Sequence, residues 1–201
     1  HQAISAYRDV LDLQAQQSEA VQALERMFGA GFERPVIGEL LEPIYTENED
    51  WNRLHDLLHA LLEHQLPGDD RMRAMHRLAE LSLEKLGDES RAFDWYGAAF
   101  KEVPEDEQSH QELARLAGVT GRWPDLVVVY TEGLQKTQDL ELVRSLSHEM
   151  ASLYREKLQD DGAAETMYRY VLDNIDDVDT KALKGLDELY EGQQRWPELV
   201  D

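Results

Sequence analysis

The sequence predicts an all-α fold in which antiparallel helical hairpins stack one after another along the chain. Three observations lead to this prediction: helix-forming residues dominate, aromatic motifs return at a fixed interval, and each interval divides into helices and turns. Unbranched side chains are common, and these lose little rotamer freedom on a helix. Hydrophobic residues make up 42% of the 201 residues, which is enough to form a core.

Tryptophan marks the interval most clearly. Trp51, Trp123 and Trp196 each precede a leucine by three positions, and the two steps between them are equal to within one position. We call this step the tryptophan interval. A second motif, Ala followed four positions later by Tyr, occurs at Ala92 and again one tryptophan interval later at Ala164. Because several independent positions share one interval, the chain is predicted to be built from tandem repeats.

An interval of this length holds about four helices, so we expect it to divide into two hairpins. One hairpin shows the pattern, with a turn at Gly87 and a second helix that ends at Pro104, because proline cannot donate to the preceding turn. Small side chains at Ala92 and Ala99 are expected to let the helices approach closely. The larger Tyr96 is expected to fill the space between hairpins.

On these residues the chain resembles the tetratricopeptide repeat family, in a degenerate form of bacterial type. The resemblance implies a right-handed α-solenoid of eleven to twelve helices, built from helix–turn–helix units of about 34 residues. The single solenoid would cover residues 1–201, with units at 1–34 (irregular), 35–68, 73–106, 107–140, 145–178 and 180–201 (truncated). His76 and Glu80 depart from the family pattern, which usually holds Trp and Gly there.

The repeat is interrupted once. Residues 3–28 match residues 164–190, yet the chain then runs through Gly29, Gly31 and Pro35 into what resembles another first helix. Two interpretations stay open: a helix has been lost, which would change the pitch or direction of the stack, or an ordinary loop precedes a displaced helix. Glycine permits the turn, and proline suits the start of a helix.

The amino-acid composition limits the kinds of molecule that the chain can bind. The chain has no cysteine, so it offers neither a disulfide nor a thiolate, and its formal net charge is −22. This charge repels polyanions, so we expect no nucleic-acid partner. No apolar run approaches the ~20 residues that span a bilayer, so we expect no membrane insertion. The excess of acidic residues has two interpretations. It either attracts a basic partner or makes the surface more soluble.

The start of the sequence bears on its origin. A chain that begins at His1 without an initiator methionine is expected to be a piece of a longer repeat array. We expect a cytoplasmic protein, with the periplasm as the alternative compartment, because a chain without cysteine tolerates both.

In the resembled family the first helices of the hairpins line a concave surface that binds peptides or helices of other proteins. The corresponding positions here are Glu39, Arg77, Leu81, Lys85, Gln111, Arg115, Glu149, Leu153, Lys157, Lys181 and Lys184. The set is mixed in charge, with Leu81 and Leu153 as expected apolar anchors. Either it binds a partner that carries both signs, or its charges pair along and between helices. The carboxylate clamp of some family members is not expected, because Leu81, Glu112 and Met150 lack the donors.

Catalytic and metal-binding motifs were sought as well. His55 and His59 stand four apart on one helix, but Asp56 replaces the glutamate of the zinc-protease pattern, so they are expected to be boundary residues beside a leucine stripe. An acidic run is expected to cap helices rather than bind calcium, and consists of Asp173, Asp176, Asp177 and Asp179. No phosphate-binding loop and no nucleophile elbow occur. We therefore expect no cofactor, no metal and no enzymatic activity.

These observations favour a protein–protein interaction scaffold that binds a peptide, helix or domain on its concave face. Two alternatives stay open. The array could be an architectural spacer, monomeric or weakly self-associating end to end through Trp196, Leu199 and Val200. It could also be a regulatory arm of an enzyme whose catalytic domain lies outside this stretch.

Overall fold

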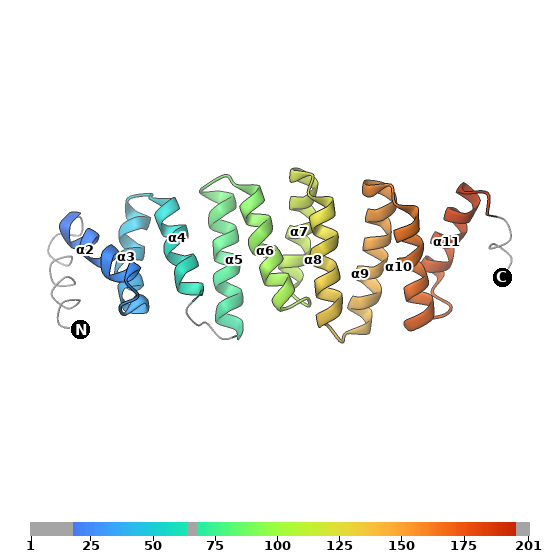
Figure 1. Cartoon of the computed structure of the whole chain (residues 1–201), viewed down its shortest axis with the longest axis horizontal. Helices are drawn as coiled ribbons and strands as arrows, with labels where there is room; N and C mark the ends of the chain where they lie inside the picture. Colours follow the sequence, from blue (N-terminus) through green and yellow to red (C-terminus); the bar gives the residue numbers. More distant parts are fainter. Residues whose placement is uncertain (1–17, 64–67, 196–201) are drawn as a thin grey trace. The chain divides into compact units, whose positions relative to one another are not determined.

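The computed structural model describes residues 18–63 and 68–195, which form helices joined by turns and short loops (Figure 1). The described residues hold ten α-helices, one π-helical turn and no strand, which confirms the predicted all-α class. In chain order they are α2 (Ser18–Gly29), α3 (Arg34–Glu47), α4 (Trp51–Leu62), α5 (Gly68–Glu84), α6 (Glu89–Glu102), α7 (Glu107–Thr120), α8 (Trp123–Lys136), α9 (Leu140–Leu153), η1 (Tyr154–Leu158), α10 (Asp161–Asn174) and α11 (Thr180–Gly192). Sequence predictions were also made on residues 3–17 and on Trp196, Leu199 and Val200, and these lie outside the described residues.

The chain forms two compact units, residues 1–95 and residues 96–201. Consecutive helices pack against each other within each unit, from α2 to α5 in the first and from α7 to α11 in the second. Helix α6 contributes its first half to one unit and its second half to the other. The handedness of the stack and a single solenoid over the whole chain stay predictions.

The tryptophan interval has a structural reason. The first helices α3, α5, α7, α9 and α11 begin at residues 34, 68, 107, 140 and 180, so the steps between them are alternately shorter and longer. Helices α3 and α7 each have 14 residues, whereas α5 has 17 and α9 is extended by the five residues of η1. Hairpins with a short first helix therefore alternate with hairpins whose first helix is longer, and one tryptophan interval holds one hairpin of each kind.

Polar side chains and glycines define where the helices begin and end. Aspartate side chains accept hydrogen bonds from backbone amides at the start of six helices, and these are Asp50, Asp88, Asp106, Asp139, Asp160 and Asp179. Such caps satisfy amides that have no partner inside the helix. Gly87 and Gly121 follow first helices with φ of 62° and 72°, a conformation that other residues rarely adopt. The predicted turn at Gly87 is confirmed.

The interruption near residue 30 is a short link between two helices that pack on each other. Helix α2 ends at Gly29 and α3 begins at Arg34, with no second helix between them. Gly31 takes a φ of 84°, and Pro35 lies in the first turn of α3, as the sequence predicts. A short loop therefore joins two helices that pack together, and whether a helix was lost here or only displaced stays a prediction.

The predicted packing residues lie in the core. Ala92 and Ala99 are fully buried, and Tyr96 is almost so, which agrees with their expected roles in close helix packing. In the second unit, Ala151, Tyr168 and Leu189 belong to one hydrophobic cluster that joins α9, α10 and α11.

Candidate functional site on the first helices

The predicted binding positions fall on first helices or directly after them, but their environments differ. In the first unit Glu39 is exposed on α3, and Arg77 forms an ion pair with Glu42. This pair joins α5 to α3. Lys85 follows α5, and its ammonium lies 5.2 Å from the ring centre of Trp51 at the start of α4.

Leu81 differs from its expected role. It was expected to be an apolar anchor on the surface, but its side chain is only 9% exposed and belongs to the core cluster of the first unit. Leu54 and Leu57 of α4 belong to the same cluster. Leu81 therefore stabilises the stack and offers no surface to a ligand. The sequence pattern alone does not distinguish the two cases, because burial of a side chain depends on how far the neighbouring helix covers it.

In the second unit two of the four predicted cations pair with carboxylates of their own helix. Arg115 lies 2.6 Å from Glu112 on α7, and Lys184 lies 3.8 Å from Glu188 on α11. These are exposed pairs between residues three or four apart, each contributing at most a few tenths of a kcal/mol. Gln111 likewise donates to Glu107. Such weak pairs are easily exchanged for contacts with a partner.

Lys181 is the exception on α11. It is exposed, and no carboxylate within the described part of the chain lies at ion-pair distance from it. Leu183, two residues further on, leaves 43% of its surface exposed. The acidic side chains of Asp187 and Glu191 are exposed on the same helix. Helix α11 therefore presents charges of both signs together with an aliphatic side chain.

Glu149 has a structural partner. Its carboxylate lies 2.8 Å from Nε2 of His110, which links α9 to α7, and it also accepts from Ser145. Burial alone would raise the pKa of Glu149, but the hydrogen bond and charge of His110 outweigh burial and lower it. Leu153, the second expected anchor, is half-buried at the end of α9.

The two lysines at the ends of the longer first helices make the same contact. Lys157, in η1, lies 5.3 Å from the ring centre of Trp123, as Lys85 does with Trp51. The step from one lysine to the other equals the step from one tryptophan to the other. The extra turn of each longer first helix thus brings a cation onto the tryptophan that begins the preceding second helix, a contact of about 0.5–1 kcal/mol at an exposed site.

A pair of small cavities in the first unit was not predicted from the sequence. Cavities of about 340 and 290 Å³ share Glu25, Tyr45 and Arg53 in their walls. The Tyr45 hydroxyl donates to Glu25 at 2.8 Å, and Arg53 lies 3.3 Å from the same carboxylate. The positive charge of Arg53 neutralises the negative charge of Glu25. The Tyr45 hydroxyl gives the same carboxylate a hydrogen bond as well.

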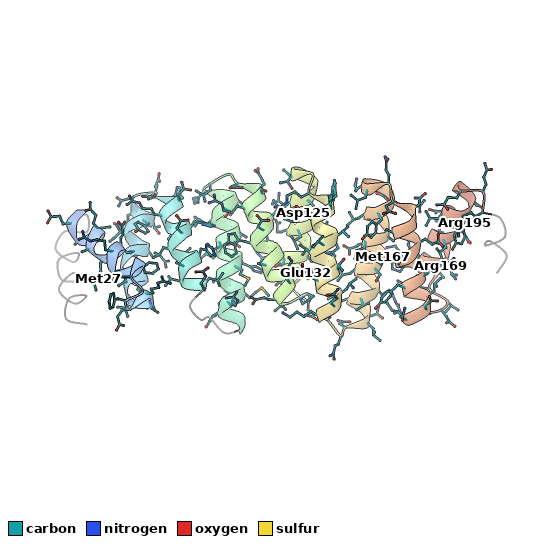
Figure 2. All side chains as sticks on the ribbon, in the orientation of Figure 1. Met27, Asp125, Glu132, Met167, Arg169 and Arg195 are labelled. Carbon is teal, nitrogen blue, oxygen red and sulfur yellow. The ribbon has the colours of Figure 1, made fainter. Side chains whose placement is uncertain are left out.

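The same triad recurs at the other end of the described chain. Tyr190 donates to Glu165 at 3.1 Å, and Arg195 lies 2.7 Å from that carboxylate and lowers its pKa. Figure 2 labels Arg195 and Arg169, which also donates to Tyr190. A Tyr–Glu–Arg triad that links a first helix to the preceding helix in both units is a packing device rather than a ligand site.

Two histidines whose spacing could suggest a metal site are packed around a tryptophan. His55 is buried and accepts a hydrogen bond of 3.0 Å from Trp95, and His59 contacts the same ring edge-on. Burial, helped by the charge of Arg91, lowers the pKa of His55. Within residues 18–63 and 68–195, no group of three His, Cys, Asp or Glu side chains is placed to hold a metal ion.

Comparison with known proteins gives no assignment. No family model matches the chain, and no curated protein matches it. The likeness to tetratricopeptide repeats therefore rests on the motifs and stays a prediction. None of the helices that the structure describes is long and apolar enough to cross a bilayer.

Proposed function

We propose that this chain is a non-catalytic scaffold that binds a peptide, helix or domain of another protein on the exposed faces of its first helices. The observation that carries the proposal is the surface of α11, where Lys181, Leu183 and Lys184 are exposed beside carboxylates. An aliphatic side chain among charges of both signs suits a partner that supplies its own apolar anchor and complementary charges. Helices α7 and η1 add Arg115 and Lys157 to this set.

Stacked helical hairpins support the proposal physically. Each hairpin buries its apolar faces against its neighbours, so the remaining exposed faces form extended surfaces that can bind long segments. The alternative of a self-associating spacer rests on residues 196–201, outside the described part of the chain.

The test is a charge reversal on α11. The variant Lys181→Glu/Lys184→Glu should lose, by tenfold or more, partners that the wild-type chain captures from a native lysate. The matched control is Arg91→Glu/Arg169→Glu, which changes the net charge equally but lies on the second helices α6 and α10. Quantitative pull-down with mass spectrometry compares the three proteins. If every partner survives in the α11 variant, the first helices are not the binding surface.

A further inference from the structure

The second unit has an edge formed by the loops that lead from each second helix into the next first helix. These loops are residues 103–106, 137–139 and 175–179, between α6 and α7, α8 and α9, and α10 and α11 (Figure 1). We call them, with their flanking residues 101–107, 136–144 and 173–180, the loop edge. Two side chains join its three parts.

Thr137 donates to Glu105 at 2.5 Å, which connects the first two loops. Arg144, near the start of α9, lies 3.6 Å from Asp176 and 3.8 Å from Asp179, which connects the second loop to the third. The three loops therefore lie side by side along one edge of the unit.

Each part of the loop edge exposes one aliphatic side chain. Val103 is 41% exposed, Leu140 is 60% exposed and Val178 is 67% exposed. Val178 directly precedes the capping Asp179, a position from which an apolar residue often packs on the first turns of its helix. Its high exposure shows that such local packing does not cover it. Single exposed aliphatic residues are common, but three in adjacent equivalent loops form a row.

The same edge is acidic. Its three segments contain ten carboxylates and three cations. Some of these charged groups interact within the protein. Asp106, Asp139 and Asp179 cap helices, and Arg144 pairs with neighbouring carboxylates. Four others have no cation at ion-pair distance within the described part of the chain, and these are Glu105, Glu107, Asp173 and Asp177.

We propose that the loop edge binds a segment of a partner protein in which aliphatic side chains alternate with Lys or Arg. The aliphatic side chains would cover Val103, Leu140 and Val178, and the cations would meet the four carboxylates that have no cation at ion-pair distance within the described residues. Charge selects this occupant, because the edge repels nucleic acid and anionic lipid. The edge lies at the N-terminal ends of the first helices and shares none of the positions predicted to bind a partner on their faces, so this proposal does not depend on the proposed function.

The test uses two synthetic probes and the full chain. One probe is an 18-residue amphipathic peptide of Leu and Lys, and the other replaces each Leu by Ser at equal charge. Fluorescence anisotropy at physiological salt should show saturable binding of the Leu/Lys peptide, with the Ser/Lys peptide binding at least tenfold more weakly. Leu140→Ser/Val178→Ser should weaken binding of the Leu/Lys peptide at least tenfold.

The control variant is Val119→Ser/Val128→Ser, whose side chains are 61% and 54% exposed but lie outside the loop edge. It should bind the Leu/Lys peptide like the wild type. Circular dichroism checks that all variants keep their helix content. Because the substituted side chains are exposed, folding should be unaffected.

Four results would overturn the proposal. Equal binding of both peptides would mean that charge alone attracts them. Binding that survives Leu140→Ser/Val178→Ser, or no binding at all, would remove the apolar row as a site. A concentration-dependent dimer that is lost in the same variant, measured by sedimentation, would assign the edge to a second copy of the chain.

Discussion

At the scale of single residues, histidine–carboxylate contacts link each first helix of the second unit to the next. His110 on α7 meets Glu149 on α9, and His148 on α9 lies 3.1 Å from Asp179, which caps α11. His148 and Asp179 are both buried. Burial alone would raise the pKa of Asp179, but the Ala182 amide and His148 outweigh it and lower the pKa. The ionised carboxylate thus serves two helices at once.

Replacing Asp179 by asparagine should test this contact. Asparagine can still cap α11, so the variant removes mainly the charge, and we expect a loss of about 1–2 kcal/mol in the free energy of unfolding at pH 7. Because the folded pKa is lowered, this stabilisation is present above the unfolded pKa of about 4 and is lost as pH falls through the folded value. Urea unfolding at pH 7 and in acid measures both effects.

The control for this prediction is Asp177→Asn, two residues away. Asp177 is exposed and has no cation at ion-pair distance within the described residues, so the stability of this variant should stay within about 0.5 kcal/mol of wild type. A difference between wild type and Asp179→Asn that stays constant into acid would mean that the carboxylate charge is not what stabilises the fold.

At the scale of helices, close packing depends on glycine where an aromatic ring crosses a helix. A side-chain carbon added to Gly185 on α11 would lie 2.4 Å from the ring of Tyr168 on α10. Tyr168 is itself buried, so its ring has little room to move. The same arrangement recurs at Gly133 on α8, where Phe100 approaches within 2.6 Å.

Gly185→Ala should therefore destabilise the protein by about 1–3 kcal/mol, despite a gain of up to about 1 kcal/mol in helix propensity. Gly192→Ala on the same helix is the matched control, because nothing lies within 4 Å of the added carbon. It should be neutral or slightly stabilising. Thermal unfolding followed by circular dichroism compares the two, and an equal effect of both substitutions would show that ring contact is not limiting.

Much of this helical arrangement could be predicted from the sequence, because local chemistry determines it. Trp51 and Trp123 begin helices, Gly87 turns the chain, and buried alanines mark the helix crossings. The π-helical turn at residues 154–158 could not be predicted, since it differs from an α-helix by a shift of one hydrogen-bond partner. Nor could the burial of Leu81, which depends on how far the neighbouring helix covers it.

The candidate site was less predictable than the fold. The sequence identified which residues lie on first helices. It did not show which of their side chains already form hydrogen bonds or ion pairs within the protein. Glu149 illustrates the difference, because its partner His110 lies 39 residues earlier and only tertiary packing brings them together. The aliphatic row of the loop edge was missed for a related reason. Exposure depends on neighbouring loops, and single valines or leucines carry no signal in the sequence.

At the scale of the whole molecule, repulsion between negative charges is the main electrostatic effect. The net charge of −22 is spread over a chain whose ion pairs are mostly exposed and individually weak. Mutual repulsion of carboxylates should therefore exceed the attraction of these pairs. Aspartate caps reduce the repulsion locally, because each faces the positive end of a helix.

Added salt should consequently stabilise the protein. Raising sodium chloride from about 10 mM to about 150 mM shortens the screening length from about 30 Å to about 8 Å. We expect the midpoint of thermal unfolding to rise by about 2–4 °C, equivalent to about 1 kcal/mol for a chain of this size. Differential scanning calorimetry measures the shift, with sucrose at equal osmolality as the uncharged control. A midpoint that falls with salt would show that ion pairs outweigh repulsion.

The alternating length of the first helices limits how such an array can grow or shrink by duplication. Removing one hairpin would place two long or two short first helices in succession, and it would separate a tryptophan from the lysine that stacks on it. Removing one whole tryptophan interval preserves both patterns. We therefore expect duplication and recombination to act on a pair of hairpins, leaving chains that differ by whole pairs.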